Sequence, residues 1–148
     1  MNNSIQKKIL IFIPAYNVEK QILRVLKKMP ILLLNEHFIR ILIIEDCSKD
    51  NTNKIVEDYI KTNANNNLIQ LIKNEKNYGY GGVQKIAFNY ALKNDFDYVI
   101  MLHGDDQYEP EKIPIFISNL LNSGADAVFG SRFINPKEPL KNGMPFNR

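Results

Sequence analysis

Five short, mostly apolar runs alternate along this chain with segments whose apolar residues recur at helical spacing. The runs occupy residues 9–13, 39–44, 68–72, 98–102 and 125–129. Continuous apolar strands are typical of a sheet that helices cover on both faces. The alternation therefore predicts an α/β fold of three layers, α/β/α, with a mostly parallel sheet and right-handed crossover connections.

The segments between the runs carry signals for helix starts. Asn17 can cap a helix after the first run, and either Ser48 or Asp50 can cap the helix after the second. A glycine-containing loop at residues 74–82 precedes a third helix, and a fourth follows from residue 113. Because each helix would connect two parallel strands, the polar segments that follow the strands should lie along one edge of the sheet.

Size and charge exclude several classes of protein. At 148 residues the chain is about one domain long, and its net charge of +3 is too small to favour a nucleic-acid partner. Cys47 is the single cysteine, which rules out an internal disulfide and fits a reducing compartment. The beginning of the chain resembles no signal peptide, and every apolar run is far shorter than a membrane span. We therefore expect a cytoplasmic protein.

The most informative polar segment follows the fourth run, where residues 103–107 are His-Gly-Asp-Asp-Gln. A carboxylate at the carboxyl end of a buried strand lies where α/β sheets bind ligands. A hard cation would take Asp105 as an oxygen ligand and complete its shell with water and substrate phosphate oxygens. Asp105 is therefore the predicted ligand for Mg²⁺ or Mn²⁺. His103 is either a second ligand or a hydrogen-bonded structural histidine.

Two further polar segments follow the first and second runs. Tyr16 could stack on a nucleobase or simply pack at the sheet edge. Asp46 could bind ribose hydroxyls or a base N–H, and we favour that role, whereas Asp50 better fits helix capping. The glycines at residues 79–82 match neither the dinucleotide nor the P-loop pattern. Their backbone N–H groups could meet a phosphate, or the segment could be a plain loop.

Together these segments resemble the family 2 glycosyltransferases of the GT-A fold. The resemblance is strongest to the branch that includes the dolichyl- and polyprenyl-phosphate sugar synthases. The matching segments are residues 13–17, 44–52, 77–82, 103–108 and 130–133.

The resemblance implies a role for each of the matched residues. Base and ribose of a nucleotide sugar would be held after the first two runs, the metal and diphosphate after the fourth, and a phosphate after the fifth. The implied substrate-binding residues are Pro14, Ala15, Tyr16, Ile44, Asp46, Gly82, Gly104, Gln107 and Arg132. Asp105 and Asp106 are the candidate catalytic residues. The sequence does not name a general base, and Asp106 qualifies only if it reaches the proton that it would abstract.

The chain departs from the family pattern at several positions. His103 replaces the first aspartate of the Asp-x-Asp segment, which leaves one carboxylate at the metal. Val18 stands where relatives often carry a glutamate, and Glu19 is a candidate substitute. Glu45 replaces the first of two aspartates. The acceptor-binding half would lie beyond Arg148, so the chain has the look of part of a longer protein. We expect residues 1–134 to form the nucleotide-sugar-binding domain and residues 135–148 a loop or the start of the acceptor-binding region.

The resulting hypothesis is an inverting glycosyltransferase that moves a sugar from a nucleotide-diphosphate donor to a lipid phosphate or glycan. Such an enzyme would serve cell-envelope polysaccharide or glycolipid synthesis, at the inner face of the membrane if parts outside this chain associate with it. The alternative is a nucleotide-binding module without turnover. A nucleotidyltransferase is a weaker alternative, since residues 14–17 lack the glycine-rich basic loop of that class.

Overall fold

The structure is a computed structural model that describes residues 6–30 and 37–131. The packing of the chain divides it into two units, Met1–Lys112 and Ile113–Arg148, and each is described by itself. The elements of the first unit are β1 (Lys8–Ala15), α1 (Ile22–Lys27), β2 (Phe38–Glu45), α2 (Thr52–Thr62), η2 (Asn66–Leu68), β3 (Ile69–Lys73), α3 (Gly79–Lys93), β4 (Tyr98–Met101) and η3 (Pro110–Lys112).

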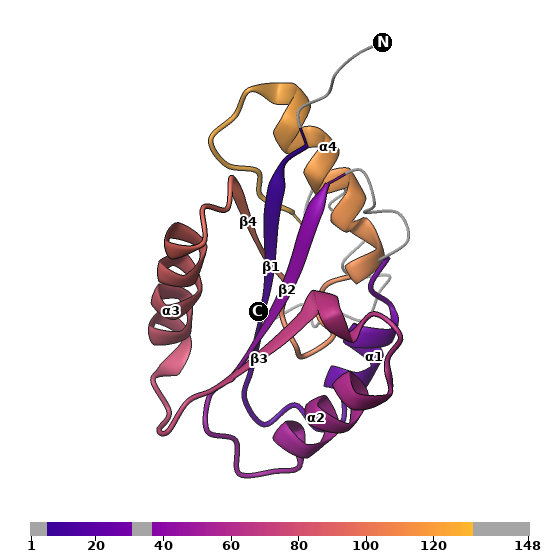
Figure 1. The fold of residues 1–148 in the computed structure, drawn as a ribbon, viewed down its shortest axis with the longest axis vertical. Helices are drawn as coiled ribbons and strands as arrows, with labels where there is room; N and C mark the ends of the chain where they lie inside the picture. Colours follow the sequence, from indigo (N-terminus) through magenta and orange to yellow (C-terminus); the bar gives the residue numbers. More distant parts are fainter. Residues whose placement is uncertain (1–5, 31–36, 132–148) are drawn as a thin grey trace, which may run out of the picture. The chain divides into compact units, whose positions relative to one another are not determined.

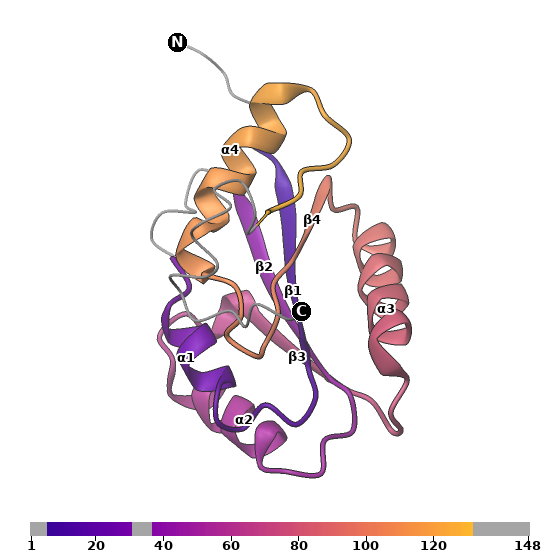
Figure 2. The same ribbon diagram turned by 180° about the vertical axis from the view of Figure 1, so that it is seen from behind.

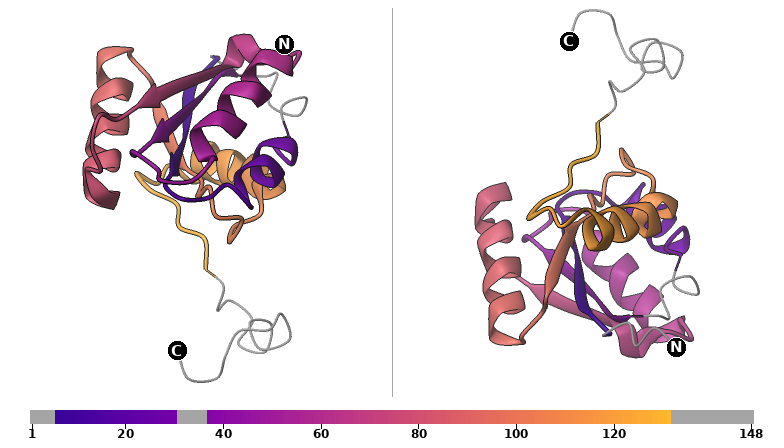
Figure 3. Two further views of the ribbon diagram at one scale, coloured as in Figure 1. Left: turned by 90° about the horizontal axis from the view of Figure 1, so that it is seen from below. Right: turned by 90° about the horizontal axis from the view of Figure 1, so that it is seen from above.

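The described strands form one parallel sheet in the order β3-β2-β1-β4. β1 lies at its centre, where Ile11 is in register with Ile41 of β2 and Ile100 of β4. α3 covers one face of this sheet, while α1 and α2 cover the other (Figures 1 and 3). The predicted α/β/α layering is therefore confirmed.

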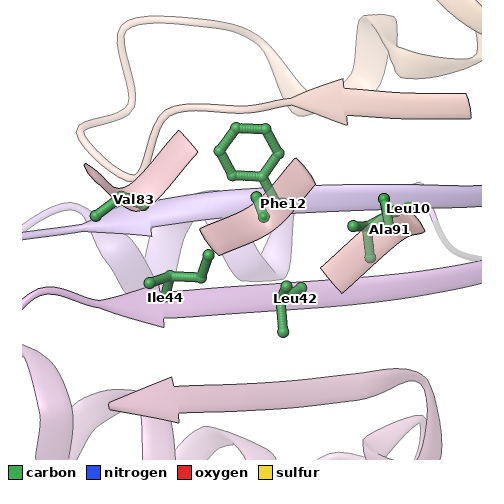
Figure 4. Close-up of a cluster of buried hydrophobic side chains, with 7 residues drawn as sticks. Leu10, Phe12, Leu42, Ile44, Val83 and Ala91 are labelled. Atoms are coloured by element: carbon green, nitrogen blue, oxygen red, sulfur yellow. The ribbon is translucent and has the colours of Figure 1, made fainter. Parts of the chain in front are cut away.

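The core is built from alternate residues of the two inner strands. Leu10, Phe12, Leu42 and Ile44 point toward α3, where they pack against Val83, Ala87 and Ala91 (Figure 4). The intervening residues of β1, such as Ile11, point toward the opposite face and are also buried, because successive side chains of a strand alternate. Each fully buried side chain of this size contributes about 1.5–3 kcal/mol. This explains why both inner strands are apolar at every core position.

Asn17 does not cap α1, so that prediction is wrong. The residue preceding α1 is Gln21, and Asn17 has a φ of 53° in the left-handed region. Asparagine adopts this conformation more readily than most residues. Its side chain instead accepts a hydrogen bond from the backbone of Lys49, in the loop after β2.

The second unit contains α4 (Ile113–Ser123), and Ile113 and Ile117 are among its buried residues. The predicted fifth strand at residues 125–129 is not formed, which corrects the expected five-stranded order. A β-prone segment needs a neighbouring strand to satisfy its backbone. Within residues 6–30 and 37–131 no strand pairs with this segment, and Phe129 is 87% exposed. In the same part of the chain, no helix has the length and apolar character required to cross a membrane.

Candidate functional site

The loops that follow the four strands lie at one edge of the sheet, because all four strands run parallel. Figure 2 shows the loops after β1 and β2 both lying below the ends of the strands. Register places Ala15 opposite Glu45, and the Leu102 N–H donates to the Phe12 carbonyl at 3.0 Å. The predicted site residues after β1, β2 and β4 therefore come from neighbouring loops. Arg132 lies outside the described residues.

The loops after β1 and β2 are joined by reciprocal hydrogen bonds, and we call residues 16–19 and 48–52 the interlocked loops. The Asn17 N–H donates to Ser48 Oγ at 3.1 Å, and Asn17 Oδ1 accepts from the Lys49 N–H at 2.8 Å. The Val18 N–H donates to Thr52 Oγ1 at 2.8 Å, in a buried position. These bonds fix the backbone next to Tyr16, whose ring is exposed.

Carboxylates of both interlocked loops accept hydrogen bonds from backbone N–H groups at the start of α2. Glu19 Oε2 accepts from the Asn51 N–H at 2.9 Å, and Asp50 Oδ1 accepts from the Thr52 N–H at 3.0 Å. Burial acts to raise the pKa of Asp50, but hydrogen bonds from Thr52 and from the Glu19 N–H outweigh it and hold that pKa below its ordinary value. The residue at the N-cap of α2 is Asn51, so the prediction that Ser48 or Asp50 occupies that position is wrong, although the Asp50 carboxylate does accept from the first N–H of the helix.

Asp46 is buried, at 3% exposure, and its carboxylate binds the loop before α3. Oδ1 accepts from Asn74 Nδ2 at 2.7 Å and from the Tyr78 N–H at 2.9 Å, and Oδ2 accepts from the Gly79 N–H at 2.9 Å. A carboxylate offers about four lone-pair sites, so most of its accepting capacity is used inside the protein. Asp46 therefore positions the glycine loop, and its predicted contact with a ligand remains a prediction.

Two of the glycines in this loop are required for different structural reasons. Gly79 has a φ of +71°, which side chains other than glycine rarely adopt. A Cβ on Gly82 would lie 2.6 Å from the Cβ of Tyr78, so the first turn of α3 leaves no room for a side chain there. The packing of Tyr78 accounts for Gly82 without a ligand, and its predicted substrate contact stays a prediction.

The two adjacent carboxylates after β4 have different surroundings. Asp106 pairs with Arg24 at 2.9 Å and Lys28 at 3.3 Å, both on α1 or its end. The Arg24 guanidinium, helped by the Lys28 ammonium, holds the pKa of Asp106 below its ordinary value despite partial burial. Asp105 Oδ1 accepts from the Gln107 N–H at 3.1 Å. Asp105 has no cationic partner among the described residues.

His103 lies between two tyrosine rings. Its ring centroid is 5.6 Å from that of Tyr80 on α3 and 5.1 Å from that of Tyr108. Its Nε2 lies 3.4 Å from the Tyr80 hydroxyl, which also donates to the sulfur of Met101 at 3.3 Å. These contacts favour the hydrogen-bonded structural role for His103, since the nitrogen facing Tyr80 already has a partner.

Gly104 permits close packing of protein against protein. A Cβ at this position would lie 2.9 Å from the Pro14 carbonyl oxygen and 3.2 Å from the Ile22 side chain. The loop carrying Asp105 is thereby held against the end of β1. The expected approach of a ligand to Gly104 is not needed to explain a glycine there.

A metal site made by the protein alone is not present in the described part of the chain, where no group of three or more His, Cys, Asp or Glu could hold an ion. A Mg²⁺-like cation commonly binds one or two carboxylates and takes its other ligands from water and substrate phosphates. Asp105, free of ion pairs in the described residues, fits a cation of that kind.

The sequence did not predict the residues that hold the predicted site residues in place. Arg24 and Lys28 hold Asp106, Asn74 holds Asp46, and Tyr80 holds His103. Arg24 and Lys28 are spaced i, i+4 on a helix, a signal that they share one face. The contacts of Asn74 and Tyr80 depend on tertiary structure, so local sequence carries no comparable signal.

Comparison with known proteins identifies the family. The family model described as "Glycosyl transferase family 2" matches residues 10–147. The chain belongs to this family. Its match includes every segment that the sequence resemblance was based on, from the loop after β1 onward.

Relatives and solved structures agree with this assignment. An uncharacterized protein of Methanocaldococcus jannaschii is 41% identical over 121 residues, which are 81% of this chain and 50% of the relative. The UDP-N-acetylglucosamine–dolichyl-phosphate N-acetylglucosaminyltransferase of Methanococcus voltae is 36% identical over 151 residues, covering 96% of this chain and 58% of the relative. The chain thus spans about half the length of these relatives.

Two solved structures share the fold. Residues 1–349 of S. aureus TarS superpose with a TM-score of 0.57 and 27% identity over 80% of this chain and 34% of that TarS fragment. The mannosyltransferase PcManGT of Pyrobaculum calidifontis, in complex with GDP-Man and Mn²⁺, gives a TM-score of 0.59 at 17% identity. That match covers 86% of this chain and 35% of the mannosyltransferase, and it shows the fold alone.

Proposed function

We propose that this chain is the donor-binding part of a glycosyltransferase that moves a sugar from a nucleotide diphosphate to an acceptor. The observation that carries the proposal is the contrast between neighbouring carboxylates after β4. Asp106 is neutralised by α1, whereas Asp105 lies at the same sheet edge without a cationic partner among the described residues. Family membership indicates the reaction class, and Asp105 offers a ligand for the cation that would bind the donor diphosphate.

Asp105 would hold a divalent cation, Mg²⁺ or Mn²⁺, together with the donor diphosphate. When bound, the cation supplies charge neutralisation for the departing diphosphate. The relative PcManGT was solved with Mn²⁺, which supports this choice. His103 remains a candidate second ligand, although its Nε2 faces the Tyr80 hydroxyl. Gln107, whose backbone is fixed by Asp105, and Arg132 are further candidates for contact with the diphosphate.

The nucleoside would bind over the interlocked loops. Tyr16 offers an exposed ring for a nucleobase, and Pro14 and Ala15 provide the backbone beside it. Ile44 and Asp46 would line the neighbouring strand end, with Asp46 acting mainly by holding the start of α3. Hydrogen bonds between the loops would keep this surface in place before the donor arrives, which lowers the entropy cost of binding.

The displacement would be inverting, with an acceptor oxygen attacking the anomeric carbon opposite the leaving diphosphate. Asp106 is the candidate base for that oxygen's proton. Its ion pairs with Arg24 and Lys28 make it a weaker base, because they favour the ionised form without a proton. We therefore propose that Asp106 chiefly positions the loop of Asp105, and that the acceptor's proton leaves by another group.

The acceptor is proposed to be a lipid phosphate, with a glycan as the alternative. The Methanococcus voltae relative is named for transfer to dolichyl phosphate, which supports the first choice. Such an acceptor lies in a membrane, so the protein would act on the cytoplasmic side at the membrane surface. A module that binds nucleotide without turnover is the competing function, and the replacement of a carboxylate by His103 favours it.

Isothermal titration with UDP and GDP, each with and without Mn²⁺, tests the donor site. Asp105→Asn should weaken Mn²⁺-dependent nucleotide binding by at least about tenfold, the scale reached by groups that merely support a metal ligand. Asp95→Asn is the matched control, since Asp95 is an exposed aspartate before β4, at the opposite end of the strand. Equal affinities of Asp105→Asn and the native protein would reject the metal role. Release of free sugar from UDP- or GDP-sugars would separate turnover from binding alone.

A further inference from the structure

One side of α1 and its leading turn presents four exposed cations. Lys20, Arg24, Lys27 and Lys28 are spaced i, i+4, i+7 and i+8, and we call this set the basic face. Residues at these intervals lie on one side of a helix. The opposite side is formed by the buried residues Ile22, Val25 and Leu26. The basic face is therefore fixed in orientation by the core.

Little negative charge offsets the basic face. Asp106 pairs with Arg24 and Lys28, and this single carboxylate against four cations leaves three positive charges. Glu19, next in sequence to Lys20, turns its carboxylate to Asn51 in the interlocked loops. Lys20 and Lys27 have no ion pair among the described residues. The neighbouring α2 adds no compensation, because its two carboxylates are paired elsewhere: Asp58 with Lys61 and Glu57 with Lys73 of β3.

We propose that the basic face docks the protein on an anionic membrane surface. Clusters of four or more Lys and Arg residues attract anionic lipid headgroups by about 1 kcal/mol for each residue near the surface. The attraction extends over about 8 Å at physiological salt, so an exposed helix face can exploit it without inserting. A nucleic acid fits less well, since this face holds no aromatic side chain for base stacking and the net charge of the chain is +3.

If the proposed function holds, the position of the basic face means that membrane docking would place the donor site next to a lipid acceptor. Asp106 joins Arg24 and Lys28 to the loop that carries Asp105. A membrane bound by α1 would therefore be linked through two ion pairs to the segment proposed to hold the donor diphosphate. A lipid-phosphate acceptor would meet the protein at the same surface. Lys20 and Lys27 supply attraction without disturbing those ion pairs.

Vesicle co-sedimentation tests the inference with the native chain. The vesicles are phosphatidylcholine alone and phosphatidylcholine mixed with an equal amount of phosphatidylglycerol. Binding is expected to the mixed vesicles alone and to weaken as NaCl is raised. The double variant Lys20→Gln with Lys27→Gln should lower the partition coefficient about 25-fold, since 1 kcal/mol for each residue is about a fivefold change.

The matched control is Lys85→Gln with Lys93→Gln, which removes the same charge from exposed positions of α3 on the other face of the sheet. It should change the partition coefficient by less than about twofold. An equal loss in both double variants would overturn the inference, because net charge alone would then explain binding. Equal binding to the neutral vesicles would also overturn it, as would a short RNA that binds as tightly and is lost in the same variant.

Nucleotide titration of the same variants separates this inference from the proposed function. Vesicle binding that depends on Lys20 and Lys27 in a protein that binds no nucleotide would support the membrane surface and reject the donor site. Nucleotide binding with no affinity for mixed vesicles would reject the membrane surface and leave the donor site standing.

Discussion

Replacing Asp46 by asparagine separates a positioning role from a ligand-binding role. In the native structure both carboxylate oxygens accept hydrogen bonds, two on Oδ1 and one on Oδ2. An asparagine keeps one oxygen and turns an N–H₂ group toward the Gly79 N–H, so one charge-assisted bond is lost and two become neutral. Losing a hydrogen bond to a charged group costs about 1.5–3 kcal/mol, and neutral bonds are about half as strong. Because the Gly79 N–H also donates to Asn77 Oδ1, the expected total loss is about 2–4 kcal/mol.

Urea unfolding followed by circular dichroism measures this loss. With a slope of about 1.5 kcal/mol/M, a loss of about 3 kcal/mol moves the midpoint down by about 2 M. Asp105→Asn serves as the control, since Asp105 accepts one bond from its own loop and should change stability by less than about 0.5 kcal/mol. If Asp46→Asn unfolded at the native urea concentration and still lost nucleotide binding, the structural account of this carboxylate would be refuted.

Three more substitutions test the edge of the sheet. Gly104→Ala should destabilise by about 1–3 kcal/mol in urea unfolding, because the new Cβ meets the Pro14 carbonyl oxygen at 2.9 Å, and an unshifted midpoint would contradict the packing. The lowered pKa of Asp106 means that its pair with Arg24 contributes stability above pH 3.8, lost as the pH falls through the folded-state value. Asp106→Asn should therefore give a shallower acid limb in a plot of stability against pH, and an identical limb would argue against the pair. His103→Asp should tighten Mn²⁺ binding in the absence of nucleotide by roughly tenfold if the cation lies beside Asp105, as titration would show.

The four strands of the described sheet could be predicted because short apolar runs in the sequence indicate them. The runs that form the inner strands β1 and β2 are buried on both faces, as a continuous apolar run indicates, whereas β3 and β4 at the edges of the sheet are half-buried. The run at residues 125–129 has a similar composition but no neighbouring strand in the described residues, so composition alone was insufficient. Strand formation depends on a partner that a short window of sequence does not specify.

The edge of the sheet was predictable, but the direction of each side chain was not. Asp46 and Asp105 both follow strands, and position in the sequence favours ligand binding for each. The structure turns Asp46 inward to three donors and leaves Asp105 with one bond from its own loop. The difference arises from the loop after β3, which brings the Tyr78 and Gly79 backbone to Asp46. That contact spans more than thirty residues, beyond the reach of a local pattern.

The interlocked loops have a consequence for changing nucleobase preference. Each segment supplies donors for the other: Asn17 and Val18 donate to side chains after β2, and Asn51 donates to Glu19. A chimera that took only residues 16–19 from a homologue would lack the hydrogen-bond partners that those residues have in the homologue. The backbone next to Tyr16 would then no longer be held by matching hydrogen bonds. Grafting both stretches together keeps the hydrogen bonds between the two loops within the transplanted material, so the pair is the smallest block to exchange when the surface beside Tyr16 is engineered.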